Sequence, residues 1–377
     1  MSAAQHAGVL DLLTELVRGR SVGGGEGALT RRAATLLDAA GFTVATPGWA
    51  DGREQLIARA GSATAPLTFT GHLDTVPADP AGWALDPWRA ERDGDRVVGR
   101  GTSDMKSGVA ALLAAATAHA ARPHDCRGLQ IVLTAGEETG CTGAATLRRA
   151  DLAAGGPLLV AEPTANRLVP GHKGAHWMQL TAAGRAAHGS APELGDNAVV
   201  RLARAAVALH DYNRWPTHET FGPVTANVGF LAGGVQPNVV PDAARMLLDV
   251  RTVPGVDGAA LRRAVAGLAG EGVHVSDHVV LPVVDTPLDD PFVSLVRDAL
   301  SATGQDTAPQ SPARFFTDAS VLAALLGVDG EPAPTVVLGP GEPDQCHVVD
   351  EWCSASRVAV AVEVYAALLE GWCASSR

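Results

Sequence analysis

The chain has 377 residues, of which 46% are hydrophobic and 19% charged. These proportions are typical of a folded protein and exclude a mainly disordered chain, and the length allows two or three domains of ordinary size. The formal net charge is −12 and no basic run occurs, so we expect neither nucleic acid nor an anionic membrane as a partner.

The N-terminal segment, residues 1–20, carries its apolar residues at helical spacing and includes Asp11 and Glu15. This pattern predicts an amphipathic helix, because a signal peptide would have a basic start and an unbroken apolar stretch. The most apolar later segment, residues 109–121, is too short to span a bilayer. The five cysteines contain no CxxC pair, so no thiolate zinc site is predicted. We therefore expect a cytoplasmic protein without membrane contact.

The outer parts of the chain alternate short apolar runs with stretches rich in alanine and leucine. The apolar runs predict strands at residues 67–70, 129–134, 158–161 and 335–338. The alanine-rich stretches predict helices at residues 30–40, 107–121, 144–152 and 357–369. Strands that alternate with helices predict an α/β fold with a mostly parallel central sheet.

The middle of the chain has a different order of elements. A strand, a helix, two strands, a helix and a last strand are predicted at residues 175–182, 197–210, 225–231, 243–250, 258–270 and 273–281. This βαββαβ order is that of a ferredoxin-like α+β domain. We therefore predict a catalytic domain made of residues 1–171 and 282–377, with a smaller domain inserted at residues 172–281.

Polar side chains follow each predicted strand of the outer domain, and Asp104 precedes the helix at residues 107–121. Ligands of open α/β sheets bind beyond the carboxyl ends of the strands, so these side chains are expected to converge. In chain order, the groups that follow the strands are His72, Asp74, Glu137, Glu138, Glu162, Gly339 and His347.

Histidines and carboxylates gathered in one pocket predict a cation, because the carboxylates would otherwise repel one another. Imidazole and carboxylate ligands without thiolate suit zinc, and cobalt or manganese are alternatives. Asp74 is close enough in sequence to His72 to fix its tautomer. Glu137 can take a proton from an activated water and return it to a leaving amine. Two metal ions that share one carboxylate are the simplest arrangement for the five candidate ligands His72, Asp104, Glu138, Glu162 and His347.

Six motifs in order along the chain carry a resemblance to a known family, over about residues 10–369. They are GHLDTVP at 71–77, GRGTSDMKSG at 99–108, TAGEETG at 134–140, AEPT at 161–164, GRAAHGS at 184–190 and the terminal His347. With these motifs the sequence resembles the di-zinc aminoacylase, acetylornithine deacetylase and succinyl-diaminopimelate desuccinylase family, which also contains glutamate carboxypeptidases and dipeptidases. The fold implied is a zinc-peptidase-like catalytic domain with an inserted lid and dimerisation domain.

The resemblance also implies a role for particular residues of the outer domain. Asp104 would bridge the two ions, with His72 and Glu162 completing one site and Glu138 and His347 the other. Glu137 matches the general base, and Asp74 matches the partner of His72. The peptide bond between Asp104 and Met105 is expected to be cis.

In the inserted domain, the resemblance implies residues that act on the substrate. His188 matches a histidine that reaches the active site of a dimer-related chain and stabilises the oxyanion. Arg251 matches an arginine that holds the substrate carboxylate. Asn227 and Asn238 match lid residues near the substrate, and Gly339 of the outer domain is expected to contact the substrate as well.

The function expected from these features is that of a metal-dependent amidohydrolase, which removes an N-acyl group from a small amino acid. The chain is expected to act as a homodimer. A carboxypeptidase or dipeptidase of the same fold is the alternative within enzymes. Outside enzymes, the alternative is a catalytically inactive, metal-stabilised binding protein, for which a general base such as Glu137 would have no use.

Overall fold

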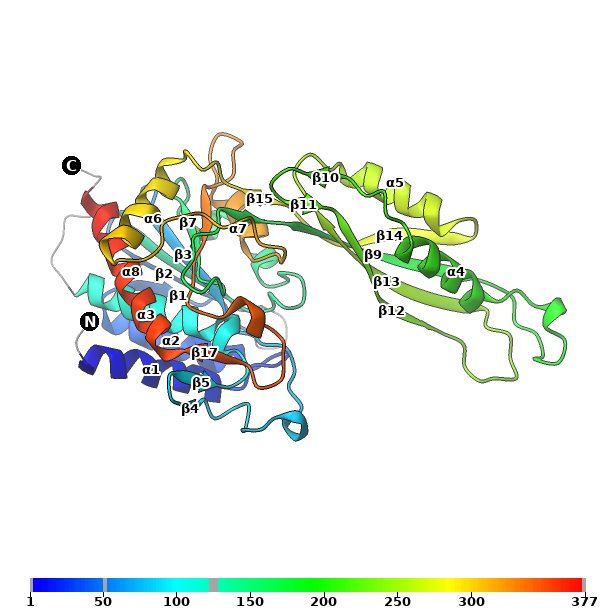
Figure 1. Ribbon diagram of the computed structural model, residues 1–377, viewed down its shortest axis with the longest axis horizontal. Coiled ribbons are helices and arrows are strands. Elements are labelled where there is room, and N and C mark those ends of the chain that lie inside the picture. Colours follow the sequence, from blue (N-terminus) through cyan, green and yellow to red (C-terminus); the bar gives the residue numbers. More distant parts are fainter. Residues whose placement is uncertain (1–2, 50–52, 122–127, 375–377) are drawn as a thin grey trace. The chain divides into compact units, whose positions relative to one another are not determined.

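The computed structural model describes residues 3–49, 53–121 and 128–374 (Figure 1). The chain forms two compact units. The large unit contains residues 1–171, 284–311 and 317–377, and the small unit contains residues 172–283 and 312–316. The sequence does not predict that the short segment Pro312–Phe316 belongs to the small unit.

A six-stranded sheet forms the centre of the large unit. Its strands, in spatial order, are β1 (Thr43–Ala45), β2 (Leu56–Ala60), β6 (Leu129–Thr134), β3 (Leu67–His72), β7 (Leu158–Val160) and β16 (Thr335–Val337). The pairings from β6 to β16 are parallel, whereas β1 and β2 run antiparallel to their neighbours. Strands β3 and β6 are buried along their whole length, which explains why they read as continuous apolar runs. The predicted α/β class with a mostly parallel sheet is confirmed.

Among the described residues of the large unit, six segments form α-helices. They are α1 (Ala3–Arg18), α2 (Glu26–Ala39), α3 (Ser107–Ala120), α6 (Pro291–Ala302), α7 (Ala319–Leu326) and α8 (Ala355–Ala374). Helix α3 packs against α1 and α8, so it is apolar on almost every side. Helix α8 reaches the sheet through Tyr365, whose ring lies 5.5 Å from that of Phe69 in β3. The Tyr365 hydroxyl donates a 2.6 Å hydrogen bond to the carbonyl oxygen of Leu338, so the aromatic contact is fixed by a polar one.

The helix predicted at residues 144–152 is wrong. This segment forms two short 3₁₀ turns, Ala144–Thr146 and Arg149–Asp151. Between them Leu147 and Arg148 are extended, with ψ of 147° and 153°. The Asp151 carboxylate accepts a 2.9 Å hydrogen bond from the Arg148 backbone N–H, and this bond starts a new turn in place of a continuous helix.

Further short strands lie in the large unit and at its border with the small unit. Strands β4 (Glu91–Asp93), β5 (Arg96–Val98) and β17 (Trp352–Ser354) form a three-stranded antiparallel sheet in the order β17-β5-β4. Strands β8 (Gly171–His172) and β15 (Val284–Asp285) lie where the chain passes between the units. Within the described ranges, none of the helices combines the length and apolar character needed to cross a membrane.

The small unit is built on a four-stranded antiparallel sheet in the order β12-β13-β9-β14. Its long elements are β9 (Gly174–Ala183), α4 (Ala198–His210), β12 (Thr225–Gly233), β13 (Ala243–Thr252), α5 (Gly258–Ala269) and β14 (Val273–Leu281). Asn197 and Asp257 cap α4 and α5 by accepting backbone N–H groups of the first turn. Buried residues of both helices pack with those of the strands in one core. This is the predicted ferredoxin-like order of elements.

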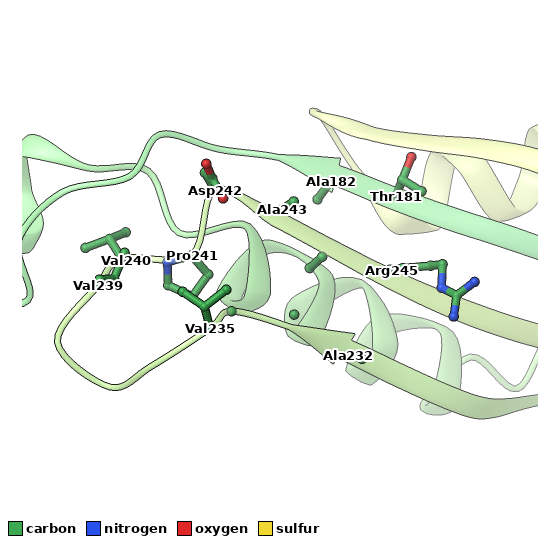
Figure 2. Close-up of a pocket in the computed structure, with 13 residues that line it drawn as sticks. Thr181, Ala182, Ala232, Val235, Val239, Val240, Pro241, Asp242, Ala243 and Arg245 are labelled. Atoms are coloured by element: carbon green, nitrogen blue, oxygen red, sulfur yellow. The ribbon is translucent and has the colours of Figure 1, made fainter.

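The turn that joins β12 to β13 lies beside an open hollow of the small unit (Figure 2). The hollow has a volume of about 570 Å³, and its lining includes Val235, Val240, Pro241 and Arg245. Two further short strands, β10 (Thr217–His218) and β11 (Gly222–Pro223), form a separate antiparallel pair.

Candidate metal centre

The polar groups of the large unit gather at one edge of its sheet because neighbouring parallel strands end there. His72 is the last residue of β3, and Glu162 follows β7 by two residues. Glu137 and Glu138 follow β6, which pairs with β3. The sequence predicts this convergence from the strand ends alone.

Asp104 enters the site from the turn that precedes α3. Gly108, in the first turn of α3, lets the helix approach β7 closely, since a Cβ there would lie 1.9 Å from the Ala161 carbonyl oxygen. This approach brings the start of α3 beside the strand end that carries Glu162. The peptide bond between Asp104 and Met105 is cis, as expected.

Two groups of possible metal ligands share Asp104. In the first, His72 Nε2 lies 3.0 Å from Asp104 Oδ1 and 3.6 Å from Glu162 Oε1. In the second, His347 Nε2 lies 3.3 Å from Asp104 Oδ2 and 3.0 Å from Glu138 Oε2. Within each group the ligand atoms all lie within 4.8 Å of one another. The structure thus brings together the five residues that the sequence selects as metal ligands.

The tautomer of His72 suits metal binding. Its Nδ1 lies 3.0 Å from the main-chain carbonyl oxygen of Asp74, and the Asp74 carboxylate is at 3.6 Å. A carbonyl only accepts hydrogen bonds, so Nδ1 carries the proton in the neutral ring. The lone pair of Nε2 is therefore directed toward Asp104 and Glu162.

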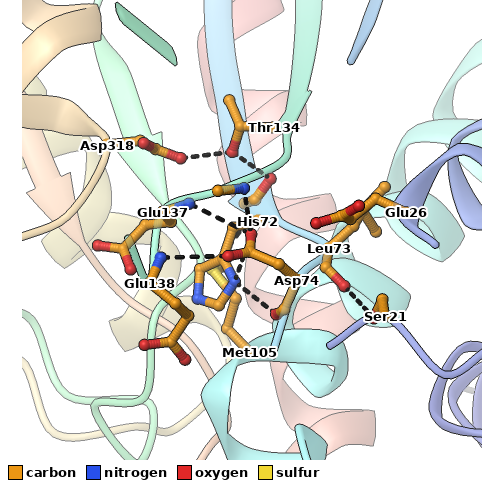
Figure 3. A network of polar contacts seen from close by, with 12 residues as sticks. Ser21, Glu26, His72, Leu73, Asp74, Met105, Thr134, Glu137, Glu138 and Asp318 are labelled. Carbon is orange, nitrogen blue, oxygen red and sulfur yellow. Dashed lines mark hydrogen bonds and ion pairs between the residues drawn. The ribbon is translucent and has the colours of Figure 1, made fainter. Parts of the chain in front are cut away.

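The carboxylate of Asp74 organises the turn after β6 (Figure 3). Its Oδ1 accepts hydrogen bonds from the backbone N–H groups of Gly136 at 2.8 Å and Glu137 at 3.2 Å, and its Oδ2 accepts from Glu138 at 3.2 Å. One side chain therefore positions both the predicted base and a predicted ligand. The sequence predicts a partnership with His72 and does not predict this second role.

The charges of the site call for a cation. Burial first, and then the charges of Glu162 and Asp318, raise the pKa of Glu137 well above its usual range. The pKa of Glu162 is raised in the same way by burial and by the charge of Asp104. Although burial opposes it, the charge of Glu162 and the hydrogen bond with Asp104 raise the pKa of His72 well above its usual value. These shifts reflect surplus negative charge in a buried place, which a divalent ion neutralises.

Glu137 is buried and belongs to neither ligand group. It is adjacent in sequence to the possible ligand Glu138, and burial raises the pKa of its carboxyl group, so its affinity for a proton is increased. A buried carboxyl group beside two possible metal sites is suited to act as a general base.

His347 differs from the other possible ligands in its exposure and backbone. Its side chain is 52% exposed, and its φ of 64° lies in the left-handed region that residues other than glycine seldom adopt. Its neighbour Cys346 is half-buried; burial first, and then the charge of Asp104, raise the pKa of the Cys346 thiol above its usual value. Cys346 belongs to neither ligand group.

In the small unit, the structure brings His188 and Asn238 together. The Gly189 N–H donates a 2.7 Å hydrogen bond to the Asn238 carbonyl oxygen. His188 Nδ1 accepts the Ser190 backbone N–H at 3.2 Å, so Nε2 carries the proton in the neutral ring. The exposed His188 side chain therefore offers a hydrogen-bond donor.

Arg251 lies at the opposite end of β13. Its Nε donates to Asp249 Oδ2 at 3.0 Å, and its guanidinium carbon lies 4.8 Å from the ring centre of Phe316. Asp249 also accepts the Trp177 indole N–H at 3.0 Å, and it pairs with Asn227 across the sheet. Arg251 Nη1 is buried and has no hydrogen-bond partner among the residues that the structure describes.

Gly339 packs against the strand end that carries Glu162. A Cβ at Gly339 would lie 2.2 Å from the Ala161 carbonyl oxygen, so only glycine fits. Its N–H donates a 3.1 Å hydrogen bond to the Thr164 hydroxyl. Substrate contact by Gly339 stays a prediction.

Two buried acids beside the site are not selected from the sequence. Asp318 accepts a hydrogen bond from the Thr134 hydroxyl, and burial raises its pKa to about 6. Glu351 is fully buried and contacts the turn that carries Asp104. The only signal for Asp318 is its place in the segment FFTDAS, and the only signal for Glu351 is its position four residues after His347.

The large unit has a mostly parallel sheet, and two groups of possible metal ligands share Asp104 at its edge. The buried Glu137 lies beside them and is in neither group. This arrangement is that of a metal-dependent hydrolase. The chain belongs to Peptidase family M20/M25/M40, whose model matches residues 68–371. Members of this family are metal-dependent, and this chain is a metal-dependent amidohydrolase. The family expected from the six motifs is thereby confirmed.

Individual relatives cover nearly the whole chain. An acetylornithine deacetylase of Vibrio campbellii is 28% identical over 347 residues, which are 88% of each chain. The crystal structure of human carnosine dipeptidase 1 has a TM-score of 0.79 with 16% identity, covering 98% of this chain and 97% of that one. A dinuclear metal binding peptidase of Bacillus subtilis has a TM-score of 0.70 with 15% identity and covers 98% of both chains.

Proposed function

We propose that the protein is a di-zinc hydrolase of N-acylated amino acids. The observation that carries the proposal is the sharing of Asp104, whose two carboxylate oxygens face His72 and His347. A first ion would be held by His72, Asp104 and Glu162, and a second by Asp104, Glu138 and His347. Nitrogen and oxygen donors without thiolate fit zinc, and cobalt and manganese fit the same donors.

Two divalent ions bound there supply Lewis-acid chemistry, which activates a water molecule and polarises the scissile carbonyl. Glu137 accepts the proton of the attacking water, since it is buried beside the ligands and is not one of them. It then returns this proton to the nitrogen of the leaving amine. His188 donates a hydrogen bond from Nε2 to the oxyanion.

The position of His188 supports a homodimer. His188 lies next to Asn238, beyond the Ala243 end of β13, whereas Arg251 lies eight residues further along that strand. At about 3.3 Å per residue, Ala243 and Arg251 are roughly 25 Å apart along β13. A single small substrate cannot touch both His188 and Arg251 in one copy of the unit. In a symmetric dimer, each site takes His188 and Arg251 from different chains.

Arg251 supports a substrate with a carboxylate. A guanidinium stacked on Phe316 and held by Asp249 is oriented in advance, and its free Nη1 offers a donor to a carboxylate oxygen. An N-acyl amino acid presents an amide bond and a carboxylate together. The similarity to acetylornithine deacetylases supports this substrate class. The cellular location that we propose for the protein is the cytoplasm.

A dipeptidase is the second candidate, and likeness to the carnosine dipeptidase structure supports it. The two substrates differ in whether a free amine precedes the scissile amide. An inactive binding protein is disfavoured because the buried Glu137 and the donor His188 are both present.

A release assay with the purified protein tests the proposal. N-acetyl, N-succinyl and N-formyl amino acids and simple dipeptides are offered with zinc or cobalt, and with a chelator as control. We expect amine release from the acylated amino acids that the chelator abolishes. Release from dipeptides alone would establish the peptidase, and no release from any substrate with two ions bound would favour the binding protein.

A further inference from the structure

Glu351, in the segment between His347 and β17, is a buried acid whose carboxylate is fully satisfied by donors. Oε1 accepts the backbone N–H groups of Ser103 at 2.8 Å and Asp104 at 3.0 Å. Oε2 accepts the Gly101 backbone N–H at 2.9 Å and Arg100 Nη1 at 2.8 Å. The side chain has no exposed surface. Four donors and no acceptor therefore face one carboxylate.

A simple role as the ion-pair partner of Arg100 does not account for this arrangement. Three of the four hydrogen bonds come from the backbone of the turn that presents Asp104. The turn needs such an acceptor, because its N–H groups have left the strand β5 and do not yet belong to α3. Asp74 holds the turn of Glu137 and Glu138 in the same manner.

The same segment carries His347. Glu351 follows His347 by four residues, and the two chain segments are also joined through Ser103. The Ser103 hydroxyl donates to the Trp352 carbonyl oxygen at 2.7 Å and accepts the Glu342 N–H at 2.9 Å. Asp104 and His347, which share a ligand group, therefore sit on two segments that are tied together by Glu351 and Ser103.

We propose that Glu351 is the positioning residue of the metal centre: its carboxylate holds the turn of residues 101–104 so that Asp104 faces both histidines. This inference rests on the proposed function. Asp104 contributes to both ligand groups, so a shift of this turn weakens the binding of both ions. The geometry assigns Glu351 no contact with the ions themselves.

Glu351→Gln is the direct test. The variant keeps the shape of the side chain but replaces one carboxylate oxygen with an NH₂ group. Each oxygen of Glu351 accepts two hydrogen bonds, so the NH₂ group faces two donors whichever oxygen it replaces. Asp95→Asn is the matched control, because Asp95 accepts hydrogen bonds from Ser354 and Ser356 of the same C-terminal segment. These bonds of Asp95 do not involve the turn of Asp104.

The measurement is titration of the metal-free full chain with zinc against a chromophoric chelator, at a temperature where circular dichroism shows each variant folded. We expect two ions in the unaltered protein, an affinity about 10- to 100-fold lower in Glu351→Gln, and no change in Asp95→Asn. Ser103→Ala removes the hydrogen bonds of the Ser103 hydroxyl to Trp352 and Glu342. We expect it to weaken zinc binding less than Glu351→Gln does. It serves as the test if Glu351→Gln does not fold.

Folded Glu351→Gln with unaltered zinc affinity would overturn the inference and leave the proposed function intact. If Glu351→Gln does not fold, unaltered affinity in Ser103→Ala would overturn it. A lowered melting temperature without a change in affinity would assign Glu351 a role in stability alone and overturn it as well. Absence of zinc binding by the unaltered protein would contradict the proposed function itself, and the inference with it.

Discussion

Three acids of the metal centre, Asp74, Asp104 and Glu137, have different surroundings and therefore different roles. Asp74 accepts three backbone N–H groups and is held in place as a support. Asp104 turns its two oxygens to two histidines, which lower its pKa despite its burial. For Glu137, burial outweighs the charge of His72 and raises the pKa. These surroundings suit Asp74 to support the turn, Asp104 to be a shared ligand and Glu137 to carry a proton.

Replacing Glu137 separates chemistry from metal binding. We expect Glu137→Gln to lower kcat by about 100- to 10,000-fold, because the amide cannot carry the proton from water to the leaving amine. Metal content should stay unchanged, since Glu137 is in neither ligand group. Steady-state kinetics and elemental analysis of the same sample check both statements. Loss of the ions together with activity would show that Glu137 is a ligand instead.

His172 gives the small unit a pH-dependent stability. Burial lowers the pKa of His172 to about 4 from the ordinary value of 6.5. The unfolded chain binds a proton between pH 6.5 and 4 that the folded chain refuses, so the free energy of unfolding decreases as the pH falls through this window. The decrease is about 3 kcal/mol at pH 4 relative to pH 7. Denaturant unfolding of His172→Gln should show a smaller loss of stability over this range, and exposed His278→Gln should behave like the unaltered protein.

At the scale of elements, the site depends on strands β3, β6 and β7, which are neighbours and end at the same edge of the sheet. Helix α3 then has to come close enough to bring Asp104 to this edge. Gly108 makes the close approach possible, because the Ala161 carbonyl oxygen occupies the place of a side chain. The packing of one helix on one strand end therefore sets the distance between Asp104 and Glu162.

Gly108→Ala tests this packing. The added Cβ has to displace backbone, so we expect a loss of about 1–3 kcal/mol in the free energy of unfolding and weaker zinc binding. Gly8→Ala in α1 is the matched control, since nothing lies within 4 Å of its Cβ position, and it should leave zinc binding unchanged. Thermal unfolding of the metal-free proteins and zinc titration measure the two effects. Unchanged zinc affinity in Gly108→Ala would show that α3 can shift without moving Asp104.

Elements with a strong apolar pattern are the ones that the sequence predicts well. Strands such as β3 and β6 are buried on both faces and keep a continuous apolar run that ends at the ligand motif. The helix predicted at residues 144–152 is wrong because the Asp151 side chain captures the Arg148 N–H, and alanine-rich composition does not reveal such a bond. Glu351 is missed for a similar reason: its donors come from a turn about 250 residues earlier.

At the scale of the whole molecule, the chain divides its chemistry between two units. The large unit holds the possible metal ligands, and the small unit holds His188 and Arg251. The sequence predicts the inserted elements from their βαββαβ order, which differs from the alternating strands and helices on either side. The sequence does not predict that Pro312–Phe316 belongs to the small unit. Phe316 packs on Trp177 and Arg251, and these contacts join distant parts of the chain.

Mixing of two inactive variants tests the proposed homodimer. A site formed in a mixed dimer of His188→Ala and Glu137→Gln chains can receive Glu137 from one chain and His188 from the other. Random exchange should therefore restore about a quarter of the unaltered activity, because half of the dimers are mixed and each has one complete site. The rate of amine release after co-refolding measures this recovery. No recovery from a sample that sedimentation shows to be dimeric would place His188 in the site of its own chain.

Metal stoichiometry tests whether two ions share Asp104. Equilibrium dialysis against zinc, followed by elemental analysis, should give two ions per chain of the unaltered protein. In Asp104→Ala both sites lose a ligand, so we expect both ions to bind at least about 10-fold more weakly. A single ion in the unaltered protein, or two tightly held ions in Asp104→Ala, would contradict this sharing.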